Sequence, residues 1–408
     1  MSQQGPILVV STAKEPSFAW TLGVAGLFPV VEVEWADAAR AVEQVQPAAV
    51  LASVAGIVGA QLAPLAARVA ACQPYLPLIA VDPDGPLPDN AIPFFQVQGN
   101  SDRLLARLRA ALRIRSLHAT VMRRLVPATR MALSDIDTSR DATVLLVGRG
   151  GAYPTLSVSL GEQAGMVGAL SIEAAARHLN TRDIDGIVLA EGFSPRVVDA
   201  FLTVLTEDAR FRHLPVVVTS PDLVPSYELP NLEILAGEPA QMVATALPLI
   251  RQHAFEAHLS RTLKSIDADG LIDARTGLLT SKAFERDFAS AVYQTQQRGG
   301  GLSVARFAFD PAHPRAQFDG GRIISRLMRQ MDFGAVFDDG SVVVAFAETD
   351  LKTAHMIARR LSSVMRHTSH GKRDVRAEPV VTVATLEPRD SANALLARLT
   401  EEAQRAAS

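Results

Sequence analysis

Short apolar runs alternate with amphipathic stretches through the first part of the chain. The runs are rich in Val, Ile, Leu and Ala and are bounded by polar, Gly or Pro positions, which is typical of buried strands. They lie at residues 7–11, 30–35, 49–54, 77–81 and 93–97. Between and after them, residues 37–45, 62–72 and 102–114 carry apolar side chains at helical spacing. This alternation predicts five β/α units around a parallel, doubly wound sheet.

Residues 141–262 repeat the same pattern. Strands are predicted at residues 143–148, 166–169, 186–190, 215–220 and 232–236, followed by a long helix over 241–263. The intervening residues 117–140 extend the preceding helix and then read as a connector. The sequence therefore predicts two α/β domains, at 1–116 and 141–262, joined by a helical connector at 117–140.

Residues 263–408 follow a different pattern, which predicts an α+β domain. Strands are expected at 302–310, 333–337, 341–346 and 380–385, and helices at 323–330, 351–364 and 393–407, with a basic loop at 367–373. The strands at 333–337 and 341–346 are separated by Asp338-Asp339-Gly340, a turn sequence that favours a β-hairpin. Adjacent strands of this kind pair antiparallel, unlike those of the first two domains.

Length, charge and the cysteine and histidine content exclude several kinds of binding site. The chain has 408 residues, enough for two to four domains, and a net charge of −3 gives no reason to expect nucleic-acid binding. The single Cys72 excludes a disulfide framework and cysteine-ligated zinc, and its apolar neighbours favour a core position. The nine histidines show no metal-binding spacing, so no metal site is expected.

Nothing in the sequence predicts a membrane segment or a signal peptide. The N-terminus M-S-Q-Q-G-P lacks a basic segment and an apolar core. The longest apolar run, residues 54–72, is interrupted by Gln61, Pro64 and Arg68. A cytoplasmic location is therefore expected.

Motifs in the third domain resemble those of GGDEF domains, the diguanylate cyclase fold. The stretch that begins at Asp273, D-A-R-T-G-L, resembles the family's D-x-L-T-G-L entry, with Arg275 in place of Leu. The hairpin falls where the family has its signature. The five signature positions are occupied here by Asp338, Asp339, Gly340, Ser341 and Val342.

The two α/β domains resemble response-regulator receiver domains of two-component systems, which have a flavodoxin-like fold. The strands L-P-L-I-A-V and L-P-V-V-V-T-S carry the resemblance, as does Glu238-Pro239 where receivers have Lys-Pro. The phosphoacceptor position falls on Ser53 in the first domain and on Ala190 or Glu191 in the second. Glu191 can be interpreted as a fixed mimic of phosphoaspartate or, more simply, as a surface carboxylate.

The positions for the acidic pair that holds Mg²⁺ are Ser11-Thr12 in the first domain and Arg149-Gly150 in the second. An aspartate attacks phosphorus only when a metal neutralises the approaching oxygens. We expect neither domain to accept phosphate.

The same chemistry predicts that the third domain is not an enzyme. The resemblance implies metal-binding carboxylates on strand 302–310 and in the signature, and of these positions only Asp310 is acidic. The others are Ala308, Gly340 and Ser341, so no metal and no cofactor are expected.

A product-binding motif is retained. Arg329-x-x-Asp332 precedes the signature by five residues, which is where cyclases have an inhibitory site for cyclic di-GMP. An arginine fork can bond guanine O6 and N7, and a carboxylate can accept from N1–H and N2–H₂. If Arg329 ends a helix, the spacing places both side chains on one face, and counting along the next helix adds Arg360. The alternative is a solvated helix end with an ion pair worth under about 1 kcal/mol.

Together these features resemble the PleD-like order of two receivers and a GGDEF domain, most closely its cyclase-dead PopA type. The resemblance implies a cyclic di-GMP effector that controls protein–protein interaction in cell-cycle or polar signalling, with partners in signalling or regulated proteolysis. It also implies a cytoplasmic homodimer, paired through the receiver-like domains, that can locate to a cell pole. A ligand-free scaffold and a residual cyclase are the alternatives.

Overall fold

A computed structural model of the chain describes residues 5–12, 22, 28–56, 59–96, 101–125, 141–219, 227–235, 238–366 and 378–407. Its internal contacts divide the chain into two compact units. The first unit comprises residues 1–142, 146–159 and 185–259, and the second comprises 143–145, 160–184 and 260–408. The basic loop predicted at 367–373 and residues 126–140 of the predicted connector lie outside the described residues.

The first module is a five-stranded parallel sheet in the order β2-β1-β3-β4-β5. Its strands are β1 Ile7–Val10, β2 Val30–Val33, β3 Ala49–Ser53, β4 Leu78–Val81 and β5 Ala91–Phe94. Its helices are η1 Trp35–Asp37, α2 Ala38–Val45, α3 Gly59–Ala70 and α4 Ser101–Arg124. The predicted strands are confirmed to within about three residues, because continuous apolar runs are what a sheet buried on both faces requires.

One predicted β/α unit of the first module is wrong. Residues 82–90, which connect β4 to β5, contain no helix. Pro83, Gly85, Pro86 and Pro88 explain this, since proline removes a backbone donor and glycine disfavours helix. β5 itself contains Pro93, which the sheet tolerates because β5 is an edge strand.

The second five-stranded sheet has the order β10-β9-β8-β6-β7. Its strands are β6 Thr143–Val147, β7 Gly165–Ala169, β8 Gly186–Leu189, β9 Val216–Thr219 and β10 Leu232–Leu235. The helices are α6 Tyr153–Gln163, α7 Ile172–Thr181, α8 Pro195–Glu207 and α9 Pro239–Asp267. Numbered from the start of each module, both sheets have the strand order 2-1-3-4-5, which is the flavodoxin-like order. The prediction of two α/β modules with parallel sheets is thus confirmed.

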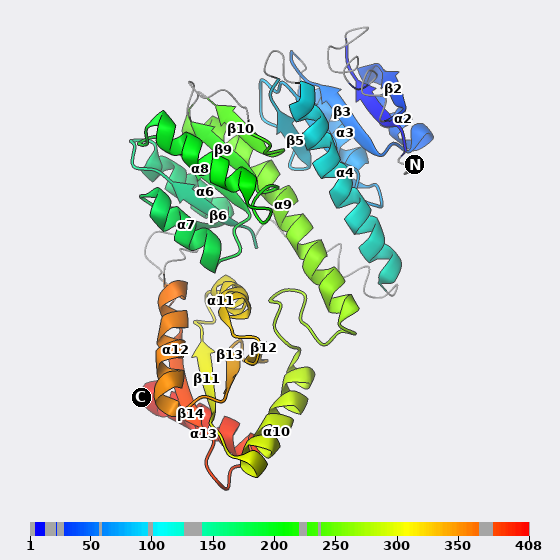
Figure 1. The fold of residues 1–408 in the computed structure, drawn as a ribbon. Helices are drawn as coiled ribbons and strands as arrows, with labels where there is room; N and C mark the ends of the chain where they lie inside the picture. The colour runs from blue at the N-terminus through cyan, green and yellow to red at the C-terminus, as the bar shows by residue number, and fades with distance from the viewer. Residues whose placement is uncertain are drawn as a thin grey trace. The chain divides into compact units, whose positions relative to one another are not determined.

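The third module is an antiparallel sheet in the order β12-β13-β11-β14. Its strands are β11 Leu302–Ala308, β12 Phe333–Val336, β13 Val342–Ala347 and β14 Val380–Thr385. Its helices are α10 Ser281–Arg298, α11 Pro314–Leu327, α12 Leu351–Met365 and α13 Ala392–Ala407. Two apolar clusters show that α11 and α12 cover one face of the sheet and α10 and α13 the other (Figure 1). No described helix of the chain is both long and apolar enough to cross a bilayer.

The helix predicted at 323–330 differs from the structure at both ends. α11 starts nine residues earlier, at Pro314, a residue type that suits the first helical turn, and it ends at Leu327. Met328 follows with extended backbone, φ −62° and ψ 149°, so the helix stops before Arg329. This end point matters for the site below.

A buried ion pair joins the first two modules inside the first unit. Arg107 of α4 is fully buried and donates to Glu233 Oε1 of β10 at 2.8 Å. Its remaining donors reach Pro230 O at 2.6 Å and Pro93 O at 2.8 Å. Burial lowers the pKa of Arg107 and raises that of Glu233, and the attraction between the two charges opposes both shifts. One guanidinium therefore fixes an edge strand of each sheet.

Two further ion pairs flank this contact. Arg113 of α4 reaches Glu256 of α9 at 2.8 Å. Arg251 of α9 pairs with Asp89, in the loop before β5. Each module thus supplies an arginine to the other from a helix that follows its last strand.

We expect Glu233→Gln to lower the free energy of unfolding by about 3–5 kcal/mol, because it leaves the Arg107 charge buried without a counter-ion. The double change Arg107→Met/Glu233→Met should be less destabilising than Glu233→Gln alone, since no charge then remains buried. Urea unfolding followed by the fluorescence of Trp20 and Trp35, both in the N-terminal part of the chain, measures this.

The matched control is Asp37→Asn, which breaks an exposed pair with Arg40 and should cost less than about 1 kcal/mol. Equal urea midpoints for Glu233→Gln and the unchanged protein would contradict a structural role for the buried pair.

Candidate functional site

The predicted hairpin of the third module is confirmed. β12 and β13 pair antiparallel, with Val336 opposite Val342. Phe337 closes the turn, donating its N–H to Ser341 O and accepting from Gly340 N–H, both at 2.9 Å. Gly340 has φ +82°, a left-handed value that glycine adopts without strain.

The polar groups of the signature turn bind one another. Asp339 Oδ1 accepts from Ser341 N–H at 2.9 Å and from Ser341 Oγ at 2.6 Å. Asp339 Oδ2 accepts from Arg306 Nη2 at 2.7 Å, and Arg306 Nε lies 3.2 Å from Ser341 Oγ. Arg306 comes from the neighbouring strand β11, so the turn is tied to the sheet by its own side chains.

These contacts set the electrostatics of the turn. Burial alone would raise the pKa of Asp339, but the hydrogen bonds from Ser341 and Arg306 outweigh it, and the pKa lies below its ordinary value. The stabilisation they provide is therefore present at neutral pH and is lost as the pH falls through the lowered pKa. A carboxylate with an arginine bound to it therefore occupies this turn.

The strand carboxylate retained from the family pattern is not part of a metal-type group. Asp310 is exposed; it accepts from Ala312 N–H at 2.9 Å and lies 3.3 Å from His313 Nδ1. Ala308, at the end of β11, offers no ligand. In the part of the chain that the structure describes, no three His, Cys, Asp or Glu side chains are grouped as a metal ion would require.

Arg329 and Asp332 lie in a turn, not on a helix. The Asp332 N–H donates to Arg329 O at 3.0 Å, which brings the two residues together after the end of α11. Arg329 is exposed, as expected, but Asp332 is only 7% exposed. The solvated helix end considered as the alternative therefore does not describe Asp332, because the turn buries its side chain.

The buried carboxyl of Asp332 is incompletely satisfied. Its Oδ1 has no hydrogen-bond partner among the described residues. Burial raises the pKa of Asp332, while backbone N–H groups of Arg329 and Ala347 and the Arg329 charge act in the opposite direction. A buried acceptor without a donor costs about 1–3 kcal/mol, so this oxygen is a strong acceptor for any donor that reaches it.

Arg360 lies on a different element from the turn. It is exposed on α12, whose buried side chains Ala354, Ala358 and Leu361 pack onto the sheet. Among the described residues, no hydrogen bond or ion pair joins Arg360 to Arg329 or Asp332. The structure thus brings two of the three predicted ligand-binding residues together and leaves Arg360 unconnected to them.

A pocket of about 560 Å³ opens beside Asp332. Its wall includes Asp287, Ser290 and Gln294 of α10, together with Gln330 from the turn. Sequence reasoning missed the α10 residues. They are three and then four residues apart, which places them on one helix face. This spacing is the feature of the sequence that could have identified them as a group.

In the two parallel-sheet modules, Ser53 and Ala190 stand at predicted acceptor positions and carry no carboxylate, whereas Glu191, the alternative in the second module, is an exposed acid. Ser53 is the last residue of β3 and is half-buried, and Ala190 follows β8 and is buried. In the second module, the N–H groups of Arg149 and Gly150 donate to Glu191 O at 3.0 and 3.2 Å. A Cβ added at Gly150 would lie 2.7 Å from that of Glu191, so the loop after β6 is closed against the residues that follow β8.

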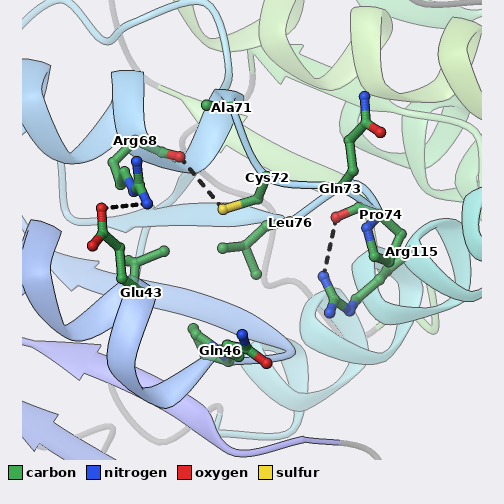
Figure 2. Close-up of a pocket in the computed structure, with 11 residues that line it drawn as sticks. Glu43, Gln46, Arg68, Ala71, Cys72, Gln73, Pro74, Leu76 and Arg115 are labelled. Carbon is green, nitrogen blue, oxygen red and sulfur yellow. Dashed lines mark hydrogen bonds and ion pairs between the residues drawn. The ribbon is translucent and has the colours of Figure 1, made fainter.

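A second cavity, of about 420 Å³, lies in the first module (Figure 2). Figure 2 shows Arg68 turned toward Glu43, and Arg115 donating to Pro74 O at 3.3 Å. The half-buried Cys72 lies on its wall, at the margin of the core rather than inside it, with its thiol 3.4 Å from Arg68 O. The polar groups here largely satisfy one another, and none of the predicted site residues lines this cavity.

No protein-family model and no curated protein matches the chain. The solved structures that align with about a third of it are GGDEF domains. The coiled coil and GGDEF domain of DgcB from Caulobacter crescentus, in complex with c-di-GMP, is 16% identical, with a TM-score of 0.28; 35% of this chain and 83% of that chain are covered.

Two structures from Pseudomonas aeruginosa align similarly. The FimX GGDEF domain is 16% identical with a TM-score of 0.30, covering 32% of this chain and 90% of that chain. Diguanylate cyclase SiaD in complex with its activator SiaC is 14% identical with a TM-score of 0.30, covering 36% and 64%. At such identities and TM-scores, these matches carry no argument about the activity of this chain.

We expect neither parallel-sheet module to be phosphorylated by acetyl phosphate in the presence of Mg²⁺, as measured by intact mass. Even Ala190→Asp, which restores an acidic acceptor, should remain unlabelled, because the closed Arg149–Gly150 loop offers no carboxylate for the metal. A hydroxylamine-sensitive phosphoryl group on the unchanged protein would contradict this expectation.

Proposed function

We propose that this protein is a non-catalytic effector that binds cyclic di-GMP through a degenerate GGDEF-type C-terminal module. The observation that carries the proposal is the Arg329–Asp332 turn, where an exposed guanidinium lies beside a buried carboxyl oxygen that has no donor among the described residues. A ligand that offers acceptors and donors along one edge satisfies both groups. Guanine does so: O6 and N7 accept from an arginine fork, while N1–H and N2–H₂ donate to a carboxylate.

Arg360 fits the proposal as a second contact. It is exposed on α12 and has no ion-pair partner among the described residues, so its guanidinium is available to a phosphate or a second base. Because nothing joins it to the turn in the free protein, its contribution depends on the ligand bridging the two elements.

The proposed lack of catalysis follows from the hairpin. Diguanylate cyclisation needs metal-bound carboxylates that activate one GTP against another. Here Ala308, Gly340 and Ser341 lack carboxylates, and Asp339 is held by Arg306 and Ser341. The turn is thus occupied by its own ion pair where a phosphate would have to approach.

We further propose that the two parallel-sheet modules are receiver-like docking domains that take no phosphate. Ligand binding at the third module would then control pairing with a second copy or with protein partners in cell-cycle or polar signalling, including regulated proteolysis. A cytoplasmic location belongs to the same proposal. The alternative is a ligand-free scaffold, which the buried ion pair between Arg107 and Glu233 favours. A ligand titration distinguishes the effector from the scaffold.

Calorimetric titration should show that the protein binds cyclic di-GMP, with Arg329 as the main contact. A bidentate arginine–guanine pair is worth about 1–3 kcal/mol, so Arg329→Ala should weaken binding roughly five- to a hundredfold. Asp332→Asn keeps the side-chain shape but presents an amide donor to guanine donors, so it should also weaken binding. Arg360→Ala should cost less.

The control is Arg196→Ala, an exposed arginine of α8, which should leave the affinity unchanged. If the unchanged protein shows no heat of binding near 100 µM ligand, a limit of about 5–6 kcal/mol, the effector proposal fails and the scaffold takes its place.

Purified protein should make no cyclic di-GMP from GTP with Mg²⁺ or Mn²⁺, measured by chromatography of the nucleotides. Asp310→Ala serves as the control, because it removes the retained strand carboxylate. Product that persists in Asp310→Ala comes from a contaminating enzyme. Product that the change abolishes would refute the absence of catalysis.

A further inference from the structure

The pocket beside Asp332 has an acidic wall. Of the residues that line it, all within the described part of the chain, the charged ones are Asp287 and Asp332, and no Arg, Lys or His is among them. Its volume of about 560 Å³ is in the range of small-molecule sites. An anionic ligand would be repelled here, and a cation or a donor of several N–H groups would be attracted.

Two observations distinguish Asp332 and Asp287 from ordinary acidic residues on the surface. Asp332 is one of the lining residues and is 7% exposed; its Oδ1 has no donor among the described residues, so an N–H that reached this oxygen would satisfy it. Asp287 is partly exposed and pairs with the neighbouring Arg286 at 3.0 Å, which is itself on the surface. Such exposed pairs are weak and exchange readily. Arg329, whose charge acts on Asp332, and Arg286, which pairs with Asp287, are both exposed and do not line the pocket.

Apolar side chains form another part of the wall, beside the polar Ser290, Gln294 and Gln330. Leu279, Met328, Met331 and Phe333 contribute alkyl, thioether and ring surface. A ligand that matches this lining has an aliphatic stem and a compact cationic head. Among such heads, guanidinium suits carboxylates best, because its planar donors pair with them in parallel and it is weakly hydrated.

We propose that this pocket binds an alkylguanidinium group, with the stem against Met328 and Met331 and the head on Asp332 and Asp287. The group can come from an arginine side chain of a protein or from a free alkylguanidinium metabolite. This site goes beyond the proposed nucleotide binding, with which it shares Asp332 but not Asp287.

The test uses the full-length protein with ¹³C-methyl methionine, whose nine residues include Met328 and Met331. The changes Met328→Leu and Met331→Leu assign their signals. The probes are N-acetyl-L-arginine amide, agmatine and N-acetyl-L-citrulline amide, the last being an uncharged isostere of the first. We expect the arginine probe to shift the Met328 and Met331 signals saturably, with half-saturation near or below about 1 mM.

Asp332→Asn should weaken this binding about tenfold or more, since it removes a charge-assisted hydrogen bond. Asp287→Asn should weaken the binding of the arginine probe less, and it should not impair folding because Asp287 is partly exposed on α10. The control Asp338→Asn, at an exposed residue of the hairpin, should have no effect on binding. Binding of the blocked arginine alone assigns the site to an arginine of a protein, and binding of agmatine as well assigns it to free alkylguanidinium compounds.

The proposal is overturned by equal shifts with the citrulline probe, by no shift with either guanidinium probe up to about 10 mM, or by unchanged affinity in both aspartate variants. Titration of Asp287→Asn with cyclic di-GMP keeps the two sites apart. Its nucleotide affinity should equal that of the unchanged protein, whatever the guanidinium result.

Discussion

The buried Arg107–Glu233 pair is the constraint on which the first unit depends. A guanidinium with no solvent exposure is tolerated only when its donors are matched, and here three acceptors surround it within 2.6–2.8 Å. Those acceptors belong to β5, to β10 and to the residue Pro230 just before β10, so a small rotation of one module against the other would break the arrangement. The pair also uses α4 and the two edge strands, which either module could otherwise offer to a second chain. A homodimer formed through these modules would therefore use other surfaces.

The third module contrasts two aspartates that are seven residues apart. Asp339 accepts hydrogen bonds from Ser341 and Arg306 on its two carboxylate oxygens, which lowers its pKa. Asp332 is buried with one oxygen unsatisfied, which raises its pKa. At neutral pH the first arrangement stabilises the fold, whereas the second destabilises it relative to a protonated side chain. A buried polar group that lowers the stability of the fold in this way is expected where a ligand or partner supplies the missing hydrogen-bond donor.

The sequence was a good guide to the strands and a poorer one to burial. Continuous apolar runs such as 143–148 predicted the parallel strands, because a strand covered on both faces must be apolar throughout. The start of α11 was missed because its first turns, 314–322, carry Gly320, Gly321 and Arg322, which are buried by tertiary contacts rather than by apolar character. The sequence predicted that Arg329 and Asp332 lie close together, but it placed them at the end of a helix, whereas the structure places them in a turn after the helix. Asp287, Ser290 and Gln294 could not be assigned to the same site, since only the folded sheet brings α10 beside the turn.

Charge decides how one aspartate could serve two ligands. Cyclic di-GMP carries two phosphates, and a wall whose charged residues are Asp287 and Asp332 would repel them. A nucleotide at the turn would therefore keep its phosphates toward the exposed guanidinium of Arg329 and offer only its guanine donors to Asp332. An alkylguanidinium in the pocket presents the same kind of planar donor edge to the same carboxyl. Asp332 Oδ1 can accept only a few hydrogen bonds. An alkylguanidinium in the pocket and a guanine at the turn would therefore compete for this oxygen, and each ligand would lower the affinity for the other through Asp332.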